Sequence, residues 1–220
     1  GIRHGNLVLP EALSKGQEKP EENTAGFCKG KRLLAAIMFT DMVGYTALMQ
    51  EDEQKAKCYR DRHRHTLQTY IKQHQGIILQ YYGDGTLSIF HSSFEAISCG
   101  IDIQAKLQEE PKIPLRIGIH VADIMYDDEG IYGDGVNVAS RIEGLAVAGS
   151  VLISGKAYDD IKNHPSISTR SLGDYELKNV KKPIEVYAIS NSSLTVPSKS
   201  QVRNQPSTKE KSLAILPFAS

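Results

Sequence analysis

The sequence predicts an α+β fold of the ferredoxin-like, split βαβ type, in which helices cover one face of a sheet. Residues 32–39 form a continuous apolar run, which is typical of a buried strand. Residues 115–124 alternate strictly between apolar and other side chains, as a half-buried strand does. Between these runs, helix and hairpin signals follow one another in the order that the split βαβ unit requires.

The elements between the two strands follow from local patterns. Residues 51–76 form a long polar helix with a sparse apolar line, and we expect Gly76 to close it. A hairpin follows at 80–90, and then a helix with an apolar face at 94–105. A helix at 135–145 and a short strand, SVLIS, come next. A second helix near 155–163 and a last hairpin, which ends in IEVYAIS, follow.

Composition limits the classes of function. Lys+Arg and Asp+Glu are each 26, so the charge balance gives no sign of a nucleic-acid partner. Cys28, Cys58 and Cys99 show no paired spacing, which argues against a disulfide framework or a zinc site and suits a reducing cytosol. No apolar run approaches the roughly 20 residues that a spanning helix needs. We therefore expect a cytoplasmic domain without membrane contact of its own, although the full-length protein could be membrane-attached elsewhere.

Shifts in composition predict the domain organisation. Residues 1–30 show no sustained period and are expected to be a leader or linker. Residues 31–190 carry the strand and helix signals of one domain. Residues 191–211 are rich in Ser, Pro and Lys and are expected to be a linker, after which 212–220 turn apolar again. This last segment is expected to begin a further domain.

A first group of candidate residues follows the first strand. Asp41 comes directly after the buried run, and Val43, Gly44, Tyr45 and Thr46 then turn into a helix. Their backbone N–H groups are expected to point outward beside the acid. A carboxylate next to free amides suits a metal–phosphate complex, with the acid on the metal and the amides on phosphate oxygens. The alternative is that Asp41 only caps the following segment.

The hairpin QYYGDGTLSIF, residues 80–90, holds a second acid. In the split βαβ order its strand pairs beside the first strand, so Asp84 at the tip can approach Asp41. Two acids on neighbouring strand ends form the skeleton of a two-metal phosphoryl-transfer site, whose ions lie roughly 3.5–4 Å apart. Taken by itself, Gly83-Asp84-Gly85 is more typical of a tight turn.

A third motif, GIYGDGVNVASRIEG, covers residues 130–144. Asn137 and Arg141 are four apart on a helix and therefore share a face. An amide and a guanidinium on one face can orient a ribose and neutralise charge that builds on a phosphoryl group. The alternative is a surface pair in which Arg141 bridges to Glu143 or another nearby acid.

Together these motifs resemble the class III nucleotidyl cyclase catalytic domain, the adenylate/guanylate cyclase family, in its bacterial form. The segments that carry the resemblance span about residues 33–190: FTDMVGYT, YYGDGTLSIF, LRIGIHVADI, YGDGVNVASRIEGLA and, more weakly, LGDYELKNVKKPIEVYAI. The linker followed by KSLAILPFAS also resembles bacterial cyclases that continue into a TolB-like and tetratricopeptide region.

The resemblance implies an activity and its cofactors. A lyase reaction would convert a nucleoside triphosphate, most often ATP, to the 3′,5′-cyclic monophosphate and pyrophosphate. Two divalent cations, Mg²⁺ or Mn²⁺, would be held by Asp41, Asp84 and the Met42 carbonyl. The fold would be a palm-type sheet with an extra C-terminal hairpin.

The resemblance also implies a partner, a second copy of the chain. In a head-to-tail homodimer, the metal acids of one chain face Asn137 and Arg141 of the other, so the active sites are shared. Asn137 would orient the ribose, and Arg141 would stabilise the pentavalent transition state. Lys178 falls near a family lysine that contacts the terminal phosphates.

The base-reading positions depart from the family pattern. Where adenylate cyclases have a lysine and an aspartate, this chain has Gln80 and Gly130, the latter followed by Ile131. A glutamine amide both donates and accepts hydrogen bonds, whereas Gly130 offers only backbone groups. ATP, GTP and a pyrimidine triphosphate therefore stay open as substrates, with ATP favoured by its frequency in the family. A catalytically weak, nucleotide-binding regulator is a further alternative.

Overall fold

The computed structural model describes residues 30–127 and 130–203. Within them lies an 8-stranded mixed sheet with the order β2-β3-β1-β4-β6-β8-β7, and β5 pairs with β4 beside this path. The strands are β1 (Arg32–Met42), β2 (Ile77–Tyr82), β3 (Gly85–Phe90), β4 (Leu115–Asp127), β5 (Gly130–Tyr132), β6 (Val151–Ser154), β7 (Thr169–Tyr175) and β8 (Ile184–Ile189). The helices are α1 (Tyr45–Glu51), α2 (Glu53–Gln73), α3 (Ser93–Leu107), α4 (Asp134–Leu145), α5 (Gly155–Ile161) and α6 (Lys199–Arg203).

The predicted split βαβ unit is confirmed. β1 pairs antiparallel with both β3 and β4, and β2 pairs antiparallel with β3. The order β4-β1-β3-β2, with α2 and α3 in the two connections, is that of the ferredoxin-like fold. The sheet continues beyond this unit, because β6 adds parallel to β4 and the C-terminal hairpin of β7 and β8 adds to β6.

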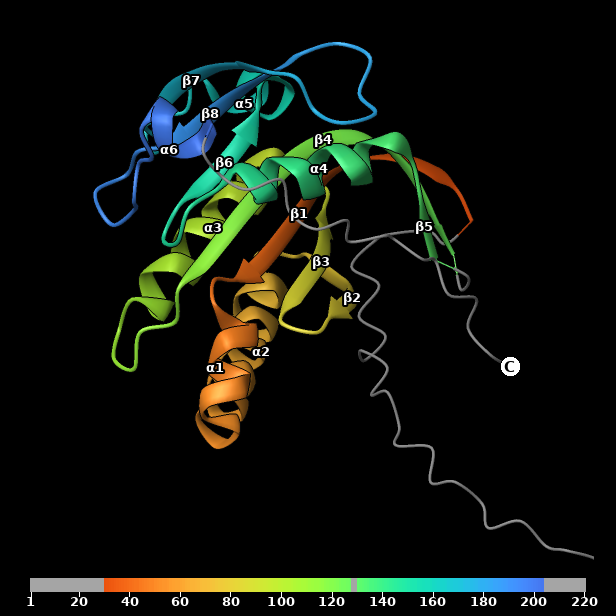
Figure 1. Ribbon diagram of the computed structural model, residues 1–220. Helices are drawn as coiled ribbons and strands as arrows, with labels where there is room; N and C mark the ends of the chain where they lie inside the picture. The colour runs from red at the N-terminus through yellow and green to blue at the C-terminus, as the bar shows by residue number, and fades with distance from the viewer. Residues whose placement is uncertain (1–29, 128–129, 204–220) are drawn as a thin grey trace, which may run out of the picture.

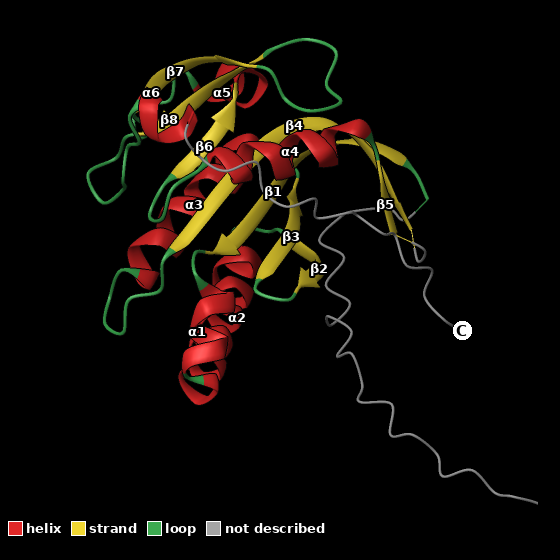
Figure 2. Cartoon of the chain, viewed as in Figure 1, coloured by secondary structure: helices red, strands yellow, loops and turns green. Residues whose placement is uncertain are grey.

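Helices cover both faces of the sheet, as Figures 1 and 2 show. One face packs against α2, α3 and α5, through residues that include Leu67, Ile103 and Ala157. α4 crosses the opposite face, where Val136 and Ala139 contact alternate residues of β1 and β3. The expectation of helices on one face describes α2 and α3 correctly but did not include α4. We call these two sides the α3 face and the α4 face.

β1 contributes buried side chains to both faces of the sheet, which explains its continuous apolar sequence. Ala36 and Met38 belong to the cluster on the α3 face, whereas Ile37 and Phe39 belong to the cluster on the α4 face. Side chains alternate between the two sides of a strand, so a central strand that is covered twice needs apolar residues at every position. The alternation places Asp41 on the α4 face, in line with Ile37 and Phe39.

The long helix α2 begins and ends at identifiable residues. The Asp52 side chain accepts a hydrogen bond from the Lys55 amide at 2.9 Å and so caps the first turn. The expectation that Gly76 closes the helix was wrong in its detail. Gln75 takes the left-handed conformation, with φ 56°. Gly76 already begins the approach to β2, where a Cβ would lie 2.4 Å from the Phe90 ring.

The predicted leader (1–30) and the segment 212–220 lie almost entirely outside the described residues and stay predictions. The first part of the predicted linker is described, and it packs on the domain. Val202 is 1% exposed and contacts the cluster that α4 forms with β6, β7 and β8. Among the described helices, none is long and apolar enough to cross a membrane.

Candidate active site

Asp41 and Arg116 meet at the end of β1. They are direct cross-strand partners in the β1–β4 ladder, and such partners lie on the same face of the sheet. An Arg116 terminal nitrogen donates to Asp41 Oδ2 at 2.6 Å, and the side chains are only 14% and 8% exposed. Pairing register therefore brings the predicted metal ligand into contact with a cation.

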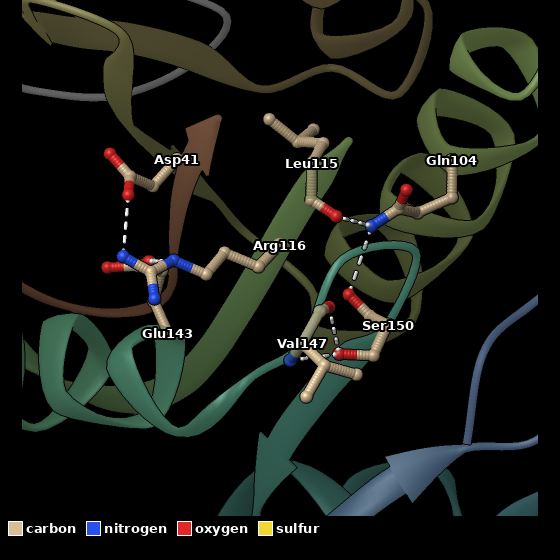
Figure 3. A network of polar contacts seen from close by, with 7 residues as sticks. All are labelled: Asp41, Gln104, Leu115, Arg116, Glu143, Val147 and Ser150. Carbon is tan, nitrogen blue, oxygen red and sulfur yellow. Dashed lines mark hydrogen bonds and ion pairs between the residues drawn. The ribbon is translucent and has the colours of Figure 1, made fainter. Parts of the chain in front are cut away.

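Glu143 of α4 contacts the same guanidinium from the other side. Its Oε1 lies 2.6 Å from Arg116 Nε, and the angle between them is outside hydrogen-bond geometry, so this is a charge contact. The Glu143 side chain is 4% exposed. Figure 3 shows the Arg116 guanidinium between the two carboxylates. Two buried acids share one cation on the α4 face.

Asp84 also interacts electrostatically with Arg116. Burial lowers the pKa of Arg116, but Glu143, Asp41 and then Asp84 outweigh it and raise that pKa above its usual value. Asp84 occupies the turn between β2 and β3, and it is half-buried. The prediction that the hairpin tip approaches the end of β1 agrees with this arrangement.

A glycine at two positions allows these elements to come close. A Cβ on Gly85 would lie 3.0 Å from the Thr40 carbonyl oxygen and 3.4 Å from Asp41 Oδ1. A Cβ on Gly118 would lie 2.1 Å from the backbone nitrogen of Glu143. The hairpin and α4 can therefore both approach the Asp41–Arg116 pair only because side chains are missing there.

A second polar network fixes the start of β4 beside Arg116 (Figure 3). The buried Gln104 amide donates to the carbonyls of Leu115 at 2.9 Å and Ser150 at 3.0 Å. The Ser150 hydroxyl donates to the Val147 carbonyl at 2.7 Å and accepts from the Val147 amide at 3.0 Å. Because Leu115 is tied to α3 and to the loop before β6, Arg116 extends from a rigid backbone.

One of the predicted phosphate-binding amides is already engaged. The Val43 N–H donates to the Pro114 carbonyl at 2.8 Å, so the expectation that this amide faces a phosphate was wrong. Gly44, with φ 79°, turns the chain into α1, and Tyr45 and Thr46 form its first turn. The amides at the start of a helix have no partner within that helix, so the prediction for these three residues stands.

Asn137 and Arg141 lie on α4, as predicted. Asn137 is exposed and Arg141 is half-buried. The Arg141 Nε is buried and has no hydrogen-bond partner in the described part of the chain. The alternative that Glu143 serves Arg141 loses support, because the Glu143 carboxylate contacts Arg116 instead.

The predicted base-reading residues border the apolar cluster of the α4 face. Gln80 is exposed and pairs with Leu87, a member of this cluster. Ile131 is 6% exposed and belongs to the cluster, and Gly130 precedes it in β5. Lys178 lies apart from them, exposed in the loop between β7 and β8.

The model of the adenylate and guanylate cyclase catalytic domain matches residues 32–191. The chain belongs to this family. A relative from Rhizobium meliloti, named putative adenylate cyclase 3, is 34% identical over 198 residues, which cover 86% of this chain and 34% of that protein. Adenylate cyclase 1 of the same organism is 23% identical over 179 residues, or 69% of this chain and 27% of that protein. The cyclase domain thus spans about a third of the length of these curated relatives.

Solved structures share the fold of this cyclase domain. An adenylate/guanylate cyclase/hydrolase from Silicibacter pomeroyi has a TM-score of 0.64 at 32% identity, covering 74% of this chain and 99% of that chain. The adenylyl cyclase CyaB from P. aeruginosa has a TM-score of 0.64 at 25% identity, covering 75% and 98%. A guanylate cyclase domain from Catenaria anguillulae, in complex with GTP, has a TM-score of 0.65 at 21% identity, covering 73% and 98%. The last likeness concerns the fold alone.

We call Asp41, Asp84 and Glu143 with the Arg116 that they surround the acid cluster, and sequence reasoning missed two of its residues. Arg116 was visible only as a member of the non-apolar side of the alternating strand, and Glu143 only as an alternative partner for Arg141. The signal that could have found Arg116 is the strand order itself. In an antiparallel β1–β4 pair, the residue at the start of β4 faces the residue at the end of β1.

Proposed function

We propose that this cyclase domain converts a nucleoside triphosphate, with ATP favoured, to its 3′,5′-cyclic monophosphate and pyrophosphate. The observation that carries the proposal is the meeting of Asp41, Asp84 and Arg116 at neighbouring strand ends. Carboxylates beside a fixed guanidinium can receive a metal–triphosphate complex, because they bind the cations and the guanidinium binds phosphate oxygens. The name of the relative that is 34% identical, a putative adenylate cyclase, supports ATP.

The acid cluster fits the divalent cations that the family implies. Mg²⁺ and Mn²⁺ prefer oxygen ligands, and the candidates are the carboxylates of Asp41 and Asp84 with the Met42 carbonyl. A Cβ on Gly85 would lie 3.4 Å from Asp41 Oδ1, so the turn of the hairpin passes close to this carboxylate. In the described part of the chain, no three His, Cys, Asp or Glu side chains form a ready-made metal site. When bound, the cations would lower the pKa of the ribose 3′-hydroxyl and offset the charge of the triphosphate.

The chain's own residues orient the substrate. Asn137 would accept or donate at the ribose, and Arg141 would donate to the oxygens on the α-phosphorus as charge builds there. When Asp41 binds a metal cation, Glu143 would still hold Arg116, so that its guanidinium stays directed at the phosphates. The 3′-oxygen loses its proton and bonds to the α-phosphorus, while the bond from this phosphorus to the bridging oxygen breaks and pyrophosphate leaves.

We propose a homodimer with shared sites, in which Asp41 and Asp84 of one chain act with Asn137 and Arg141 of the other. A guanylyl cyclase domain of the same fold, from Blastocladiella emersonii, is described as a non-canonical dimer, so it supports self-association but not this particular arrangement. A two-fold axis repeats every contact, so two equivalent sites would form. Lys178, in its exposed loop, would reach the terminal phosphates of the nucleotide.

The test is product analysis. The purified chain is incubated with each of the four nucleoside triphosphates and Mn²⁺ or Mg²⁺, and the products are resolved by chromatography. A cyclic monophosphate and an equal amount of pyrophosphate are expected from ATP. A cyclic product from GTP alone would overturn the proposed substrate, and no cyclic product from any nucleotide would favour a nucleotide-binding regulator.

A further inference from the structure

Gln80 and Tyr82 lie on the α4 face, in register with the acid cluster. One row across the sheet joins Gln80 to Leu87 and Leu87 to Phe39. The next row joins Tyr82 to Gly85, which lies beside Asp41. Residues two apart on a strand point to the same side, so Gln80 and Tyr82 are neighbours on the surface that the nucleotide is proposed to contact.

The Tyr82 ring has a fixed position. It stacks on Phe39 with ring centroids 6.3 Å apart and an interplanar angle of 24°. It also packs against the apolar cluster of the α4 face. A tyrosine hydroxyl is a hydrogen-bond donor at neutral pH. A rigid hydroxyl donor therefore stands next to Gln80.

That hydroxyl donates to the Gln80 side-chain oxygen Oε1 at 2.8 Å. A glutamine amide has one acceptor end and one donor end, and rotating it exchanges them. Because Tyr82 donates to Oε1, the amide is oriented with its N–H₂ group away from the Tyr82 hydroxyl, and this donor group is the one offered to an incoming base. A glutamine can otherwise donate to a base or accept from it, and the contact with Tyr82 restricts Gln80 to donating.

We propose that Tyr82 determines base specificity by holding Gln80 as a hydrogen-bond donor, so that the site selects ATP over GTP. The Watson–Crick edge of adenine has an acceptor at N1, which an amide N–H₂ can satisfy. The same edge of guanine carries donors at N1 and N2 beside its O6 acceptor, so an N–H₂ group placed for adenine N1 would face a guanine donor. A site that leaves such groups unpaired loses affinity for that base. This inference rests on the proposed function, since it assumes that Gln80 contacts the base.

The test is the ratio of kcat/KM for ATP to kcat/KM for GTP in the intact chain and in Tyr82→Phe. The phenylalanine keeps the ring on Phe39 but frees the Gln80 amide to rotate. We expect the intact chain to prefer ATP, and the ratio to fall about threefold to tenfold in the variant, which is the range for one neutral hydrogen bond. A residue with a merely structural role would lower both rates equally and leave the ratio unchanged.

The matched control is Tyr81→Phe, the same chemical change one residue away. Tyr81 points to the other side of the hairpin, where its hydroxyl accepts from Gln68 Nε2 at 3.2 Å and Arg64 lies 4.8 Å from its ring centroid. The ATP to GTP ratio should therefore stay at the level of the intact chain. An equal fall in both variants would mean that hairpin stability, and not the orientation of Gln80, sets the ratio.

A second variant and a second readout separate this inference from the proposed function. Gln80→Glu presents only acceptors, so GTP should gain on ATP; an unchanged ratio would show that Gln80 does not read the base. Competition of ATP and GTP for a bound fluorescent ATP analogue measures the same preference without turnover. Binding that prefers ATP and depends on Tyr82, with no cyclic product, would support the inference and overturn the proposed activity. An intact chain that prefers GTP in both readouts would overturn the inference.

Discussion

The two faces of the sheet differ in what they bury. The α3 face holds a large apolar cluster that includes Ile97, Ile103 and Leu107, all at 0% exposure. The α4 face holds a smaller apolar cluster and, at its edge, the buried charges of Asp41, Arg116 and Glu143. Burial of apolar area stabilises a fold without direction, whereas buried charges are stable only with partners in defined positions. One strand, β1, therefore contributes to stability on the α3 face and to the proposed chemistry on the α4 face.

Asp41→Ala should give the largest effect on the α4 face. Loss of this carboxylate should lower cyclase activity by about a hundredfold or more, because Asp41 would hold the cations, and Arg141→Ala should do the same, because Arg141 would stabilise the charge on the reacting phosphate. Mixing the two inactive variants should restore roughly a quarter of the activity, since half of the dimers are mixed and each has one intact site. Product formation by the mixture is the measurement. If both variants dimerise and the mixture stays inactive, the sites are not shared.

Glu143→Gln should have the next largest effect. It removes one of the two carboxylates that contact Arg116, and because Asp41 remains, the loss should lie below the about 3–5 kcal/mol of a fully broken buried pair. The midpoint of urea unfolding should fall, and kcat/KM should fall with it because Arg116 loses its support. Glu53→Gln is the control, since Glu53 forms an exposed pair with Lys57 at 2.8 Å and its loss should leave the urea midpoint nearly unchanged. Similar losses in both variants would contradict the special position of Glu143.

Ile103→Ala tests the α3 face alone. This side chain is 0% exposed within α3, so its truncation should lower the free energy of unfolding by about 2–5 kcal/mol. Activity per folded molecule and the ATP to GTP ratio should stay unchanged, because Ile103 packs in the apolar cluster of the α3 face, whereas Asp41 and Arg116 lie on the α4 face. Denaturant unfolding and initial rates on the folded fraction provide the two measurements. A changed ratio would show that the two faces are not separable in this way.

The smallest effect concerns one buried histidine on each face. Burial lowers the pKa of both His63, on α2, and His120, on β4, to about 4, with a further decrease from Arg64 or Lys156. Histidines of the unfolded chain titrate near 6.5, so the unfolded state binds more protons between pH 6.5 and 4. The folded state should therefore lose stability as the pH falls, by about 2 kcal/mol for each histidine between pH 7 and pH 5.

Substitution separates the two histidines. The His120 Nδ1 lies 2.8 Å from Ser154 Oγ, whereas neither ring nitrogen of His63 has a hydrogen-bond partner in the described ranges. His63→Leu should reduce the acid-induced loss and leave stability at pH 7 equal or higher. His65→Gln, at an exposed position of the same helix, is the control. Urea unfolding at both pH values gives the comparison, and an unchanged acid-induced loss in His63→Leu would contradict it.

The sequence was sufficient for the split βαβ order and for the approach of the β2–β3 hairpin to the end of β1, because apolar periodicity and this order determine them. It was insufficient for contacts that depend on pairing register. Asp41 faces Arg116 because β1 and β4 pair at that offset, and the Val43 amide is engaged because Pro114 lies opposite it. Neither fact has a local signal. The direction of the Gln80 amide also depends on a tertiary neighbour, the ring of Tyr82 on Phe39.

The side of the sheet that α4 covers was equally beyond local reasoning. The period through Val138, Ile142 and Leu145 predicted a helix with an apolar face, and the structure has Val138 and Ile142 buried and Leu145 partly buried, as this pattern requires. A helical period gives the width of the apolar face but not the identity of the surface that it meets. That surface depends on the crossover after β5, which no periodic pattern encodes.

α4 lies directly on the backbone of β4 at both of its ends. A Cβ on Gly135 would lie 2.1 Å from the Cβ of Ala122, and a Cβ on Gly118 would lie as close to the Glu143 backbone. α4 and β4 therefore form one rigid unit, so Asn137 and Arg141 cannot move unless β4 moves with them. Alanine is ordinarily the mildest replacement, but at these two glycines a single methyl group would act as a wedge. A misplacement of about 1 Å can cost a hundredfold in rate. Gly118 and Gly135, which have no side chain, therefore determine where the Arg141 guanidinium lies.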